Sequence, residues 1–200
     1  MSDTRLDAVE RQRDIYVQGA AGRRSPVPVD GEELEAAAQE VMSPEAFAYI
    51  AGGAGREATM EANLQGFDDL QIVPRMLRDV GTRDLSMNFL GKAWPTPMML
   101  SPIGVLEMAH PQADSAVGRA AAQRGVPYIF SNQASVPMEE VGEAMGDASR
   151  FFQLYWSQSN ELVTSLVRRA EAAGCEAIFV TLDTTLLGWR VRDLGLAYLP

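Results

Sequence analysis

The sequence is a chain of 200 residues, of which 46% are hydrophobic and 8% aromatic, with a formal net charge of −10. This apolar fraction is typical of a folded globular protein with a substantial core and argues against a disordered chain. The acidic charge argues against a protein that binds nucleic acid or docks on anionic membranes, because both need a basic surface.

Cysteine content and the N-terminal segment indicate the compartment. A single cysteine, Cys175, cannot form an internal disulfide, and its place between a helix end and a strand is typical of a small buried hydrophobe. The first residues are charged and lack the apolar core of a secretory signal, and no apolar run reaches the length of about 18 residues that a membrane helix needs. We therefore expect a cytoplasmic protein.

The N-terminal third of the chain predicts helices without strands. Residues 1–28 are polar and then rich in Arg, Gly and Pro, which predicts a flexible N-terminal arm. Residues 29–70 predict a small helical segment: Asp30 can cap a first helix, Ser43 followed by Pro44 can start a second, and a third covers about Glu57–Leu64.

From residue 71 to residue 200 the pattern changes to alternating strands and helices. Four short apolar runs predict buried strands: Pro97–Pro102, Val126–Ser131, Phe151–Tyr155 and Ala177–Thr181. Between them lie three segments of helical character: Ala113–Gln123, Pro137–Ala144 and Glu161–Ala173. Continuous apolar strands that alternate with amphipathic helices indicate an α/β fold with a parallel sheet covered by helices.

Four such units suit either a doubly wound sheet or half of a (β/α)₈ barrel. The glycine-rich phosphate loops GxGxxG and GxxxxGK[ST], which are typical of nucleotide-binding sheets, do not occur at the strand ends. Small hydroxyl and amide side chains follow the strands instead, and in a barrel the active site is built at that rim. We therefore predict the first half of a (β/α)₈ TIM barrel, preceded by the helical segment.

The predicted rim offers neutral hydrogen-bonding groups. These are the side chains of Ser131, Gln153 and Thr181, the phenols of Tyr49 and Tyr155, and the exposed backbone at Ile103 and Gly104. The rim has no cluster of His, Cys or carboxylates spaced as metal ligands, so we expect no metal. A planar, uncharged heterocycle such as a flavin fits this lining best, although on the strand ends alone ordinary polar loop caps are the better explanation.

Several motifs together resemble the FMN-dependent 2-hydroxy-acid oxidases and dehydrogenases. They are YIAGGAG at 49–55, VPRML at 73–77, SPIGV at 101–105, FFQLY at 151–155 and TLDTTLLGWRVRDL at 181–194. They cover about residues 30–200 in family order, and GWRVRDL, SPIGV and IYVQG near position 15 look most similar to the lactate 2-monooxygenase branch. The resemblance implies FMN as the cofactor and oxidation of a small L-2-hydroxy acid, with hydride passing to flavin N5 and O₂ as the acceptor.

The resemblance also implies roles for individual residues. Pro102, Ile103 and Gly104 match the backbone beside the flavin, and Ser131, Gln153 and Thr181 match side chains that bind the ring and its ribityl chain. Tyr49 and Arg190 match residues of the substrate pocket. Tyr155 matches a phenol near the substrate hydroxyl, where it would bind substrate and support catalysis. The resemblance further implies a homo-oligomer, commonly a tetramer.

Three positions depart from the common family pattern. Gln133 stands where many relatives have a larger apolar side chain, Gly104 stands where many have alanine, and the stretch Thr185–Leu187 differs from the glycolate oxidase version. These differences leave the identity of the hydroxy acid open.

The family mechanism also requires a histidine base, a carboxylate-binding arginine and a lysine near flavin N1, which in relatives follow the segment matched here. The only histidine, His110, matches a non-catalytic loop position. We therefore expect residues 1–200 alone to hold flavin weakly and not to turn over. Two alternatives stay open: a truncated, non-catalytic half-barrel or interaction module, and a flavin barrel of other chemistry.

Overall fold

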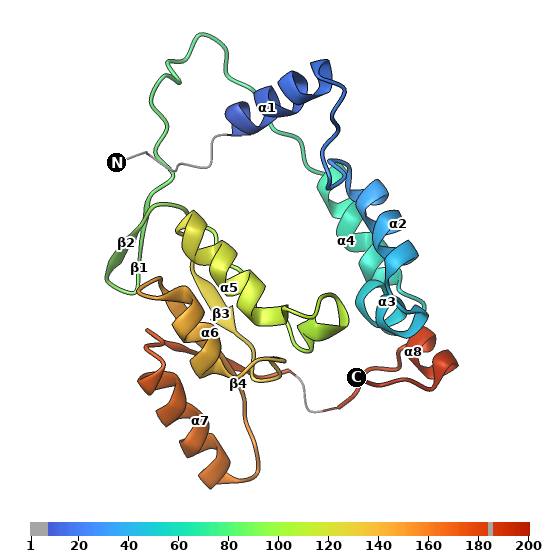
Figure 1. The fold of residues 1–200 in the computed structure, drawn as a ribbon, viewed down its shortest axis with the longest axis vertical. Helices are drawn as coiled ribbons and strands as arrows, with labels where there is room; N and C mark the ends of the chain where they lie inside the picture. The colour runs from blue at the N-terminus through green and yellow to red at the C-terminus, as the bar shows by residue number, and fades with distance from the viewer. Residues whose placement is uncertain (1–7, 184–185) are drawn as a thin grey trace.

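The structure is a computed structural model that describes residues 8–183 and 186–200. The first seven residues of the expected arm, and Thr185 of the stretch at 185–187, lie outside the described residues. Figure 1 shows an α/β arrangement. Its elements are α1 (Ala8–Ala20), α2 (Gly31–Val41), α3 (Pro44–Ala51), α4 (Ala58–Asp68), β1 (Met87–Phe89), β2 (Lys92–Trp94), η1 (Leu106–Met108), α5 (Ala113–Arg124), β3 (Tyr128–Phe130), α6 (Met138–Met145), β4 (Arg150–Tyr155), α7 (Asn160–Ala172), β5 (Ile178–Thr181) and α8 (Val191–Leu196).

The central sheet is parallel and runs β3-β4-β5, with Ile129 opposite Phe151 and Tyr155 opposite Thr181. The parallel sheet and the helices α5, α6 and α7, each of which precedes one of its strands, were predicted correctly. The first expected strand, Pro97–Pro102, is reduced to one parallel bridge at Leu100, whose N–H donates to the Pro127 carbonyl (2.9 Å). Proline lacks the amide hydrogen that a longer ladder needs, so the prolines at both ends of this run limit its pairing.

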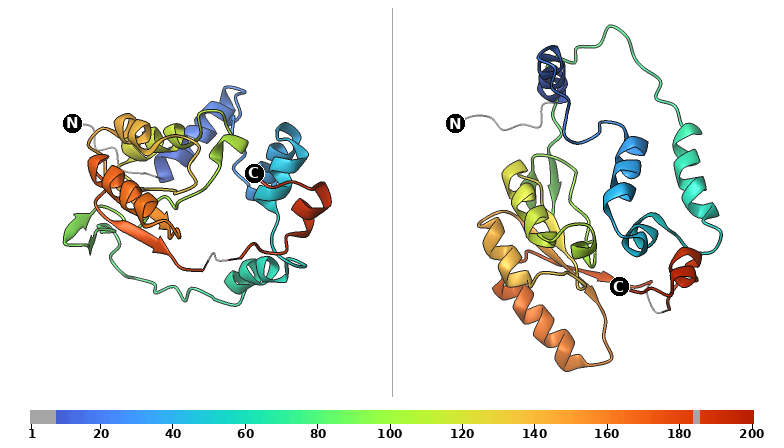
Figure 2. Two further views of the ribbon diagram at one scale, coloured as in Figure 1. Left: turned by 90° about the horizontal axis from the view of Figure 1, so that it is seen from below. Right: turned by 45° about the vertical axis from the view of Figure 1, so that its right-hand side comes forward.

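The two faces of the sheet bury different clusters because successive side chains of a strand point to opposite sides. Tyr128, Phe130, Phe152 and Leu154 pack on one side against helix residues such as Val141. Helices α5, α6 and α7 cover this side (Figures 1 and 2). On the other side, a smaller cluster forms from Ile129 and Phe151 with Trp94, and Phe179 packs against it. In a closed barrel this second side faces the interior.

An antiparallel hairpin, β1–β2, closes the amino-terminal end of the sheet, and sequence analysis did not predict it. Trp94 from this hairpin is 4% exposed and stacks obliquely on Phe151, with ring centroids 5.8 Å apart. The Lys92 ammonium donates to Ser149 Oγ (2.7 Å) and Glu176 Oε1 (2.8 Å), which precede β4 and β5. The hairpin therefore lies opposite the carboxyl ends, where the predicted site is.

The helical segment follows the predicted caps closely. Asp30 Oδ1 accepts hydrogen bonds from the amides of Glu32 (3.0 Å) and Glu33 (3.1 Å), and Ser43 Oγ accepts one from Ala46 (3.2 Å). The expected arm over residues 1–28 needs correction, because residues 8–20 form helix α1, although this helix buries no residue. Helix α8 was also not predicted.

In space, α2, α3, α4 and α8 form a group beside the sheet, and the segment between α4 and β1 runs around the outside (Figure 2). Within the described residues, no helix is both long and apolar enough to cross a membrane.

Replacing Trp94 with alanine should lower the free energy of unfolding by about 3 kcal/mol, because it removes a large buried ring and opens a cavity under the sheet. Urea unfolding followed by circular dichroism measures this change. The matched control is Trp156→Ala, since Trp156 is 66% exposed and its loss should change stability by about 0.5 kcal/mol or less. Equal effects of the two substitutions would contradict the assignment of Trp94 to the core.

Candidate functional site

Three predicted side chains meet at the carboxyl ends of the parallel strands. Gln153 is 3% exposed, and its side chain lies between its neighbours: Nε2 donates to Thr181 Oγ1 (2.9 Å) and Oε1 accepts from the Asn132 amide (3.1 Å). Ser131 is 6% exposed, and its hydroxyl accepts a hydrogen bond from the Gln133 amide (3.0 Å). The structure therefore brings Ser131, Gln153 and Thr181 together in one polar row, as the sequence predicted.

This row lies on the barrel-interior side of the sheet. Gln153 follows Phe151 by two residues and Thr181 follows Phe179 by two, so all four share one face. Apolar rings therefore occupy the floor and neutral polar groups the rim. In the loop that follows β3, the buried Asn132 Oδ1 has no hydrogen-bond partner among the described residues. A buried acceptor of this kind is suited to a ligand donor.

The loop Pro102–Val105 lies directly against the loop that follows β3. The Val105 amide donates to the Gln133 carbonyl (2.9 Å), and Val105 adopts a left-handed conformation with φ 53°. A Cβ atom added to Gly104 would lie 3.0 Å from Gln133 Cβ and 3.8 Å from Ser131 Oγ. The two departures from the family pattern, Gly104 and Gln133, are thus neighbours, and a methyl group at position 104 would crowd Gln133.

Tyr155 ends β4 directly opposite Thr181, on the same side of the sheet as Gln153. It is half-buried, and its hydroxyl forms no hydrogen bond with the described part of the chain. A phenol in this state can donate to a ligand at the rim.

Tyr49 and Arg190 meet in the helical group. The Arg190 guanidinium lies 4.8 Å from the centre of the Tyr49 ring. It donates to the carbonyl oxygens of Tyr49 and Gly52, the latter at 3.0 Å, and its Nε donates to Asp193 Oδ2. Arg190 therefore joins α8 to the end of α3. Sequence analysis assigned it to the substrate pocket, and here much of its donor capacity is used within the chain.

A second arginine strengthens the same junction. The Arg192 guanidinium donates to Glu57 Oε2 (2.5 Å), and Glu57 Oε1 accepts from the Gly53 amide (3.0 Å). The hydrogen bond from Arg192 is the main cause that lowers the pKa of Glu57 below its ordinary value. The Trp189 carbonyl also accepts a bond from the Gly55 amide (2.8 Å), so the YIAGGAG turn and the GWRVRDL segment form one unit.

Two other reactive residue types lie in structural settings. His110 stands at the entrance to α5, where its Nδ1 accepts a hydrogen bond from the Gln112 amide (3.1 Å). Cys175 packs against the helix-covered cluster, and burial raises the pKa of its thiol to about 11. No group of three or more His, Cys, Asp or Glu in the described ranges is arranged to hold a metal ion.

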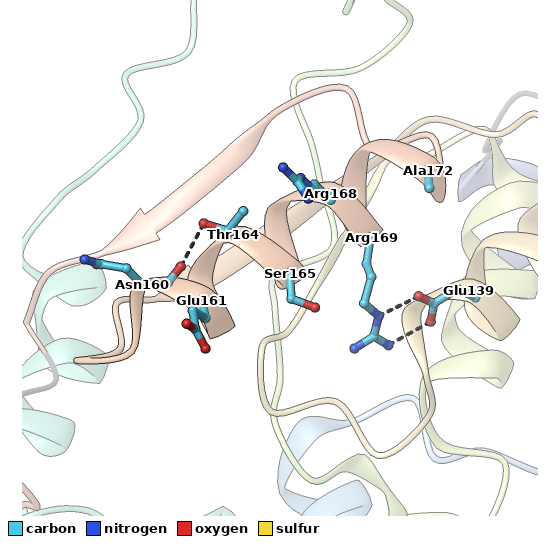
Figure 3. A pocket seen from close by; sticks show the side chains of 8 residues that line it. All are labelled: Glu139, Asn160, Glu161, Thr164, Ser165, Arg168, Arg169 and Ala172. Carbon is cyan, nitrogen blue, oxygen red and sulfur yellow. Dashed lines mark hydrogen bonds and ion pairs between the residues drawn. The ribbon is translucent and has the colours of Figure 1, made fainter.

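A shallow groove on the outer helices lies apart from this rim. Figure 3 shows its lining from α7 together with Glu139 of α6. Arg169 forms two hydrogen bonds with Glu139 (2.7 and 2.9 Å), and these are the main cause that lowers the pKa of Glu139 to about 2. An exposed ion pair of this type is typical of a solvated helix surface, so we place the candidate site at the strand ends.

These features define half of an α/β barrel whose strand ends present neutral hydrogen-bonding groups above an apolar floor. A family model described as FMN-dependent dehydrogenase matches residues 38–199. The chain belongs to this family, whose cofactor is FMN.

Individual relatives agree with this assignment. The chain is 41% identical to an L-lactate oxidase of Lysinibacillus sphaericus (strain C3-41) over 177 residues, which are 88% of this chain and 46% of that protein. It is 40% identical to the 4-hydroxymandelate oxidase of Amycolatopsis orientalis over 162 residues, 81% of this chain and 45% of that protein. The chain thus spans about half the length of the curated relatives it matches.

A solved crystal structure of mandelate oxidase superposes with a TM-score of 0.80 at 38% identity, covering 87% of this chain and 50% of that one. The predicted fold class, half of a TIM barrel with a helical segment before it, is confirmed by this match. The neutral row at Ser131, Gln153 and Thr181 fits the edge of a flavin ring, because that edge carries uncharged donors and acceptors.

Replacing Arg190 with methionine should destabilise α8 by about 2 kcal/mol, because it removes charge-assisted hydrogen bonds and leaves the buried Asp193 without its cation. Hydrogen exchange of residues 191–196 should then become about thirtyfold faster. The control is Arg168→Met on α7, where the arginine is exposed and forms no hydrogen bond or ion pair with the described residues. Unchanged exchange in α8 would show that the junction does not depend on Arg190.

The thiol of Cys175 should react slowly with a disulfide reagent at pH 8. With a pKa of about 11, about one thiol in a thousand is ionised at that pH, and only the thiolate is nucleophilic. Labelling should be about a hundredfold slower than in denaturing urea, where the thiol regains an ordinary pKa, and it should accelerate as the pH rises toward 11. Fast labelling of the folded protein would instead identify Cys175 as a reactive thiol.

Proposed function

We propose that this chain forms the flavin-binding face of an FMN-dependent oxidoreductase that converts a small, lactate-like L-2-hydroxy acid into the 2-oxo acid or its decarboxylated product, with O₂ as the acceptor. The observation that carries the proposal is the polar row of Ser131, Gln153 and Thr181 at the carboxyl ends of parallel strands in a member of this family. Similar relatives named for lactate and 4-hydroxymandelate oxidation support the class of substrate.

The residues of this chain supply binding and orientation. FMN, when bound, accepts the hydride that the hydroxy acid loses. Gln153 and Thr181 would bind the uncharged edge of its ring, with Ser131 on the neighbouring strand end. The backbone of Pro102–Gly104 would lie beside the ring, because Gly104 has no side chain to hold it away.

The substrate would lie between the rim and the helical group. Tyr155, whose hydroxyl has no partner among residues 8–183 and 186–200, lies on the interior side of β4 and would donate to the substrate oxygen on which charge develops. Tyr49 would contact the substrate carboxylate, and the positive charge of Arg190 beside the Tyr49 ring would attract it. Gln133, which fills the position beside Gly104, would then border the side chain of the acid.

The proton-abstracting base and the second carboxylate-binding cation would come from the part of the barrel that the relatives have and this chain does not span. The single histidine, His110, is used at the entrance to α5 and does not supply a base. By resemblance we also propose a monooxygenase outcome, a homo-oligomeric assembly such as a tetramer, and a cytoplasmic location.

A visible-absorption titration with FMN tests the cofactor proposal. FMN should bind weakly to the 200-residue chain and shift its band at about 450 nm, because the row contacts one edge of the ring only. Gln153→Leu should weaken binding about tenfold through lost hydrogen bonds, whereas Gln123→Leu on the exposed face of α5 should not. The absence of any spectral shift with the unmodified chain would count against the proposal.

Anaerobic reductants then test the reaction. With the complete barrel, L-lactate should bleach the flavin band and NADH should not, which separates hydroxy-acid oxidation from nucleotide-dependent flavin chemistry. With residues 1–200 alone, lactate should leave the band unchanged for lack of a base. Stoichiometric flavin and lactate oxidation by residues 1–200 would show that the base lies within this chain after all.

A further inference from the structure

Asp114 is a buried carboxylate to which neither the sequence motifs nor the proposed reaction assigns a role. It lies in the first turn of α5 and is 1% exposed. One oxygen, Oδ2, accepts hydrogen bonds from the amides of Ser135 (2.9 Å) and Val136 (3.2 Å), and the other accepts from the Tyr128 hydroxyl (3.1 Å). A buried carboxylate with three donors has a specific structural task, because its desolvation is costly unless every bond is made.

The two amides belong to the loop that follows β3, and this loop carries the proposed cofactor contact Ser131. Asp114 holds the far end of the loop, while β3 holds its beginning. The anionic oxygen also lies where the first-turn amides of α5 favour negative charge. The path of residues 131–136 is therefore set by one side chain on a neighbouring helix.

The same network extends to the second loop of the site. Ser135, whose amide is bound by Asp114, accepts a hydrogen bond at its Oγ from the Glu107 amide (3.1 Å). The Gln133 carbonyl accepts one from the Val105 amide (2.9 Å). The loop of Pro102–Gly104 is thus joined at two points to the loop that Asp114 anchors.

Tyr128 keeps this arrangement in one protonation state. Burial, reinforced by the nearby Asp114 carboxylate, raises the pKa of the Tyr128 phenol well above its ordinary value. The phenol therefore remains a donor over the working range of pH. Because Tyr128 is also part of β3, its hydroxyl joins the sheet itself to the carboxylate.

We propose that Asp114 is a positioning residue for the cofactor wall: through Ser135 and Val136 it sets the loops 131–136 and 102–107 in the relative position that a flavin ring requires. The inference rests on the proposed function for the identity of the ligand. The anchoring of the loops is independent of it and can be measured without FMN.

Hydrogen exchange of the 200-residue chain tests the anchoring. In Asp114→Ala, amides of residues 131–136 and 102–108 should exchange about tenfold faster or more, while β4 and α7 keep their protection. Asp114→Asn should restore the slow exchange, because its amide oxygen can accept both loop amides and its NH₂ group can donate to the Tyr128 oxygen. An equal rise in β4 and α7 would overturn the proposal, since Asp114 would then act on stability in general.

A milder variant covers the case in which Asp114→Ala does not fold. Ser135→Ala removes the hydroxyl that receives the Glu107 amide and keeps the backbone bond to Asp114. Exchange should rise about tenfold at residues 105–108 and stay unchanged at Val136. Uniform exchange across both loops, or no change at 105–108, would overturn the proposed link.

FMN titration of the same variants separates the positioning role of Asp114 from the proposed flavin-binding function. If the unmodified chain shifts the flavin band, Asp114→Ala should weaken FMN binding about tenfold and Asp114→Asn should bind as the unmodified chain does. Loosened loops with unchanged FMN affinity would overturn the positioning role. If neither the unmodified chain nor a variant shifts the flavin band, the proposed function fails. The exchange result alone then decides whether Asp114 anchors the loops.

Discussion

The candidate site depends on the two hydrogen bonds that the buried Gln153 side chain forms with neighbouring strand ends. A buried amide must find partners for both its donor and its acceptor, and here the partners are the Thr181 hydroxyl on β5 and the Asn132 amide after β3. The three strand ends are therefore joined by one side chain. In a parallel sheet these ends share an edge, so the hydrogen bonds that stabilise the edge also arrange the groups that a flavin would contact.

Around this row, charged groups act mainly on the positions of backbone segments. Asp114 binds loop amides, Arg190 binds the carbonyl oxygens at the end of α3, and Arg192 binds the carboxylate that caps the glycine turn. Each of these groups has partners within the chain, and the polar groups at the rim itself are neutral.

Several large apolar residues of the chain are highly exposed. The segment between α4 and β1 contains Ile72, Val73 and Leu77, which are 95%, 84% and 104% exposed, and Leu182 after β5 is 85% exposed. The matched segment makes up 46% of the L-lactate oxidase and 50% of the solved mandelate oxidase chain. A (β/α)₈ barrel fills its interior from both halves, so half of it leaves apolar surface that the other half covers.

Much of the local structure could be predicted from the sequence because its causes are local. Asp30 and Ser43 are good caps, the apolar runs are separated by amphipathic helices, and polar residues stand at the end of each run. The register-independent rule that parallel strands end at one edge was sufficient to place Ser131, Gln153 and Thr181 together. Family motifs indicated the cofactor.

Only the tertiary structure decided the remaining features, because they depend on contacts between distant residues. The Trp94 hairpin is too short to show a strand period, and Leu100 keeps a single bridge where a full strand was expected. Asp114 looks like an ordinary surface charge in the sequence, and the family resemblance assigned Arg190 to the substrate pocket without indicating its contacts within the chain. Their roles arise because folding brings Asp114 to amides about twenty residues away and Arg190 to carbonyl groups well over a hundred residues away, distances over which no local propensity acts.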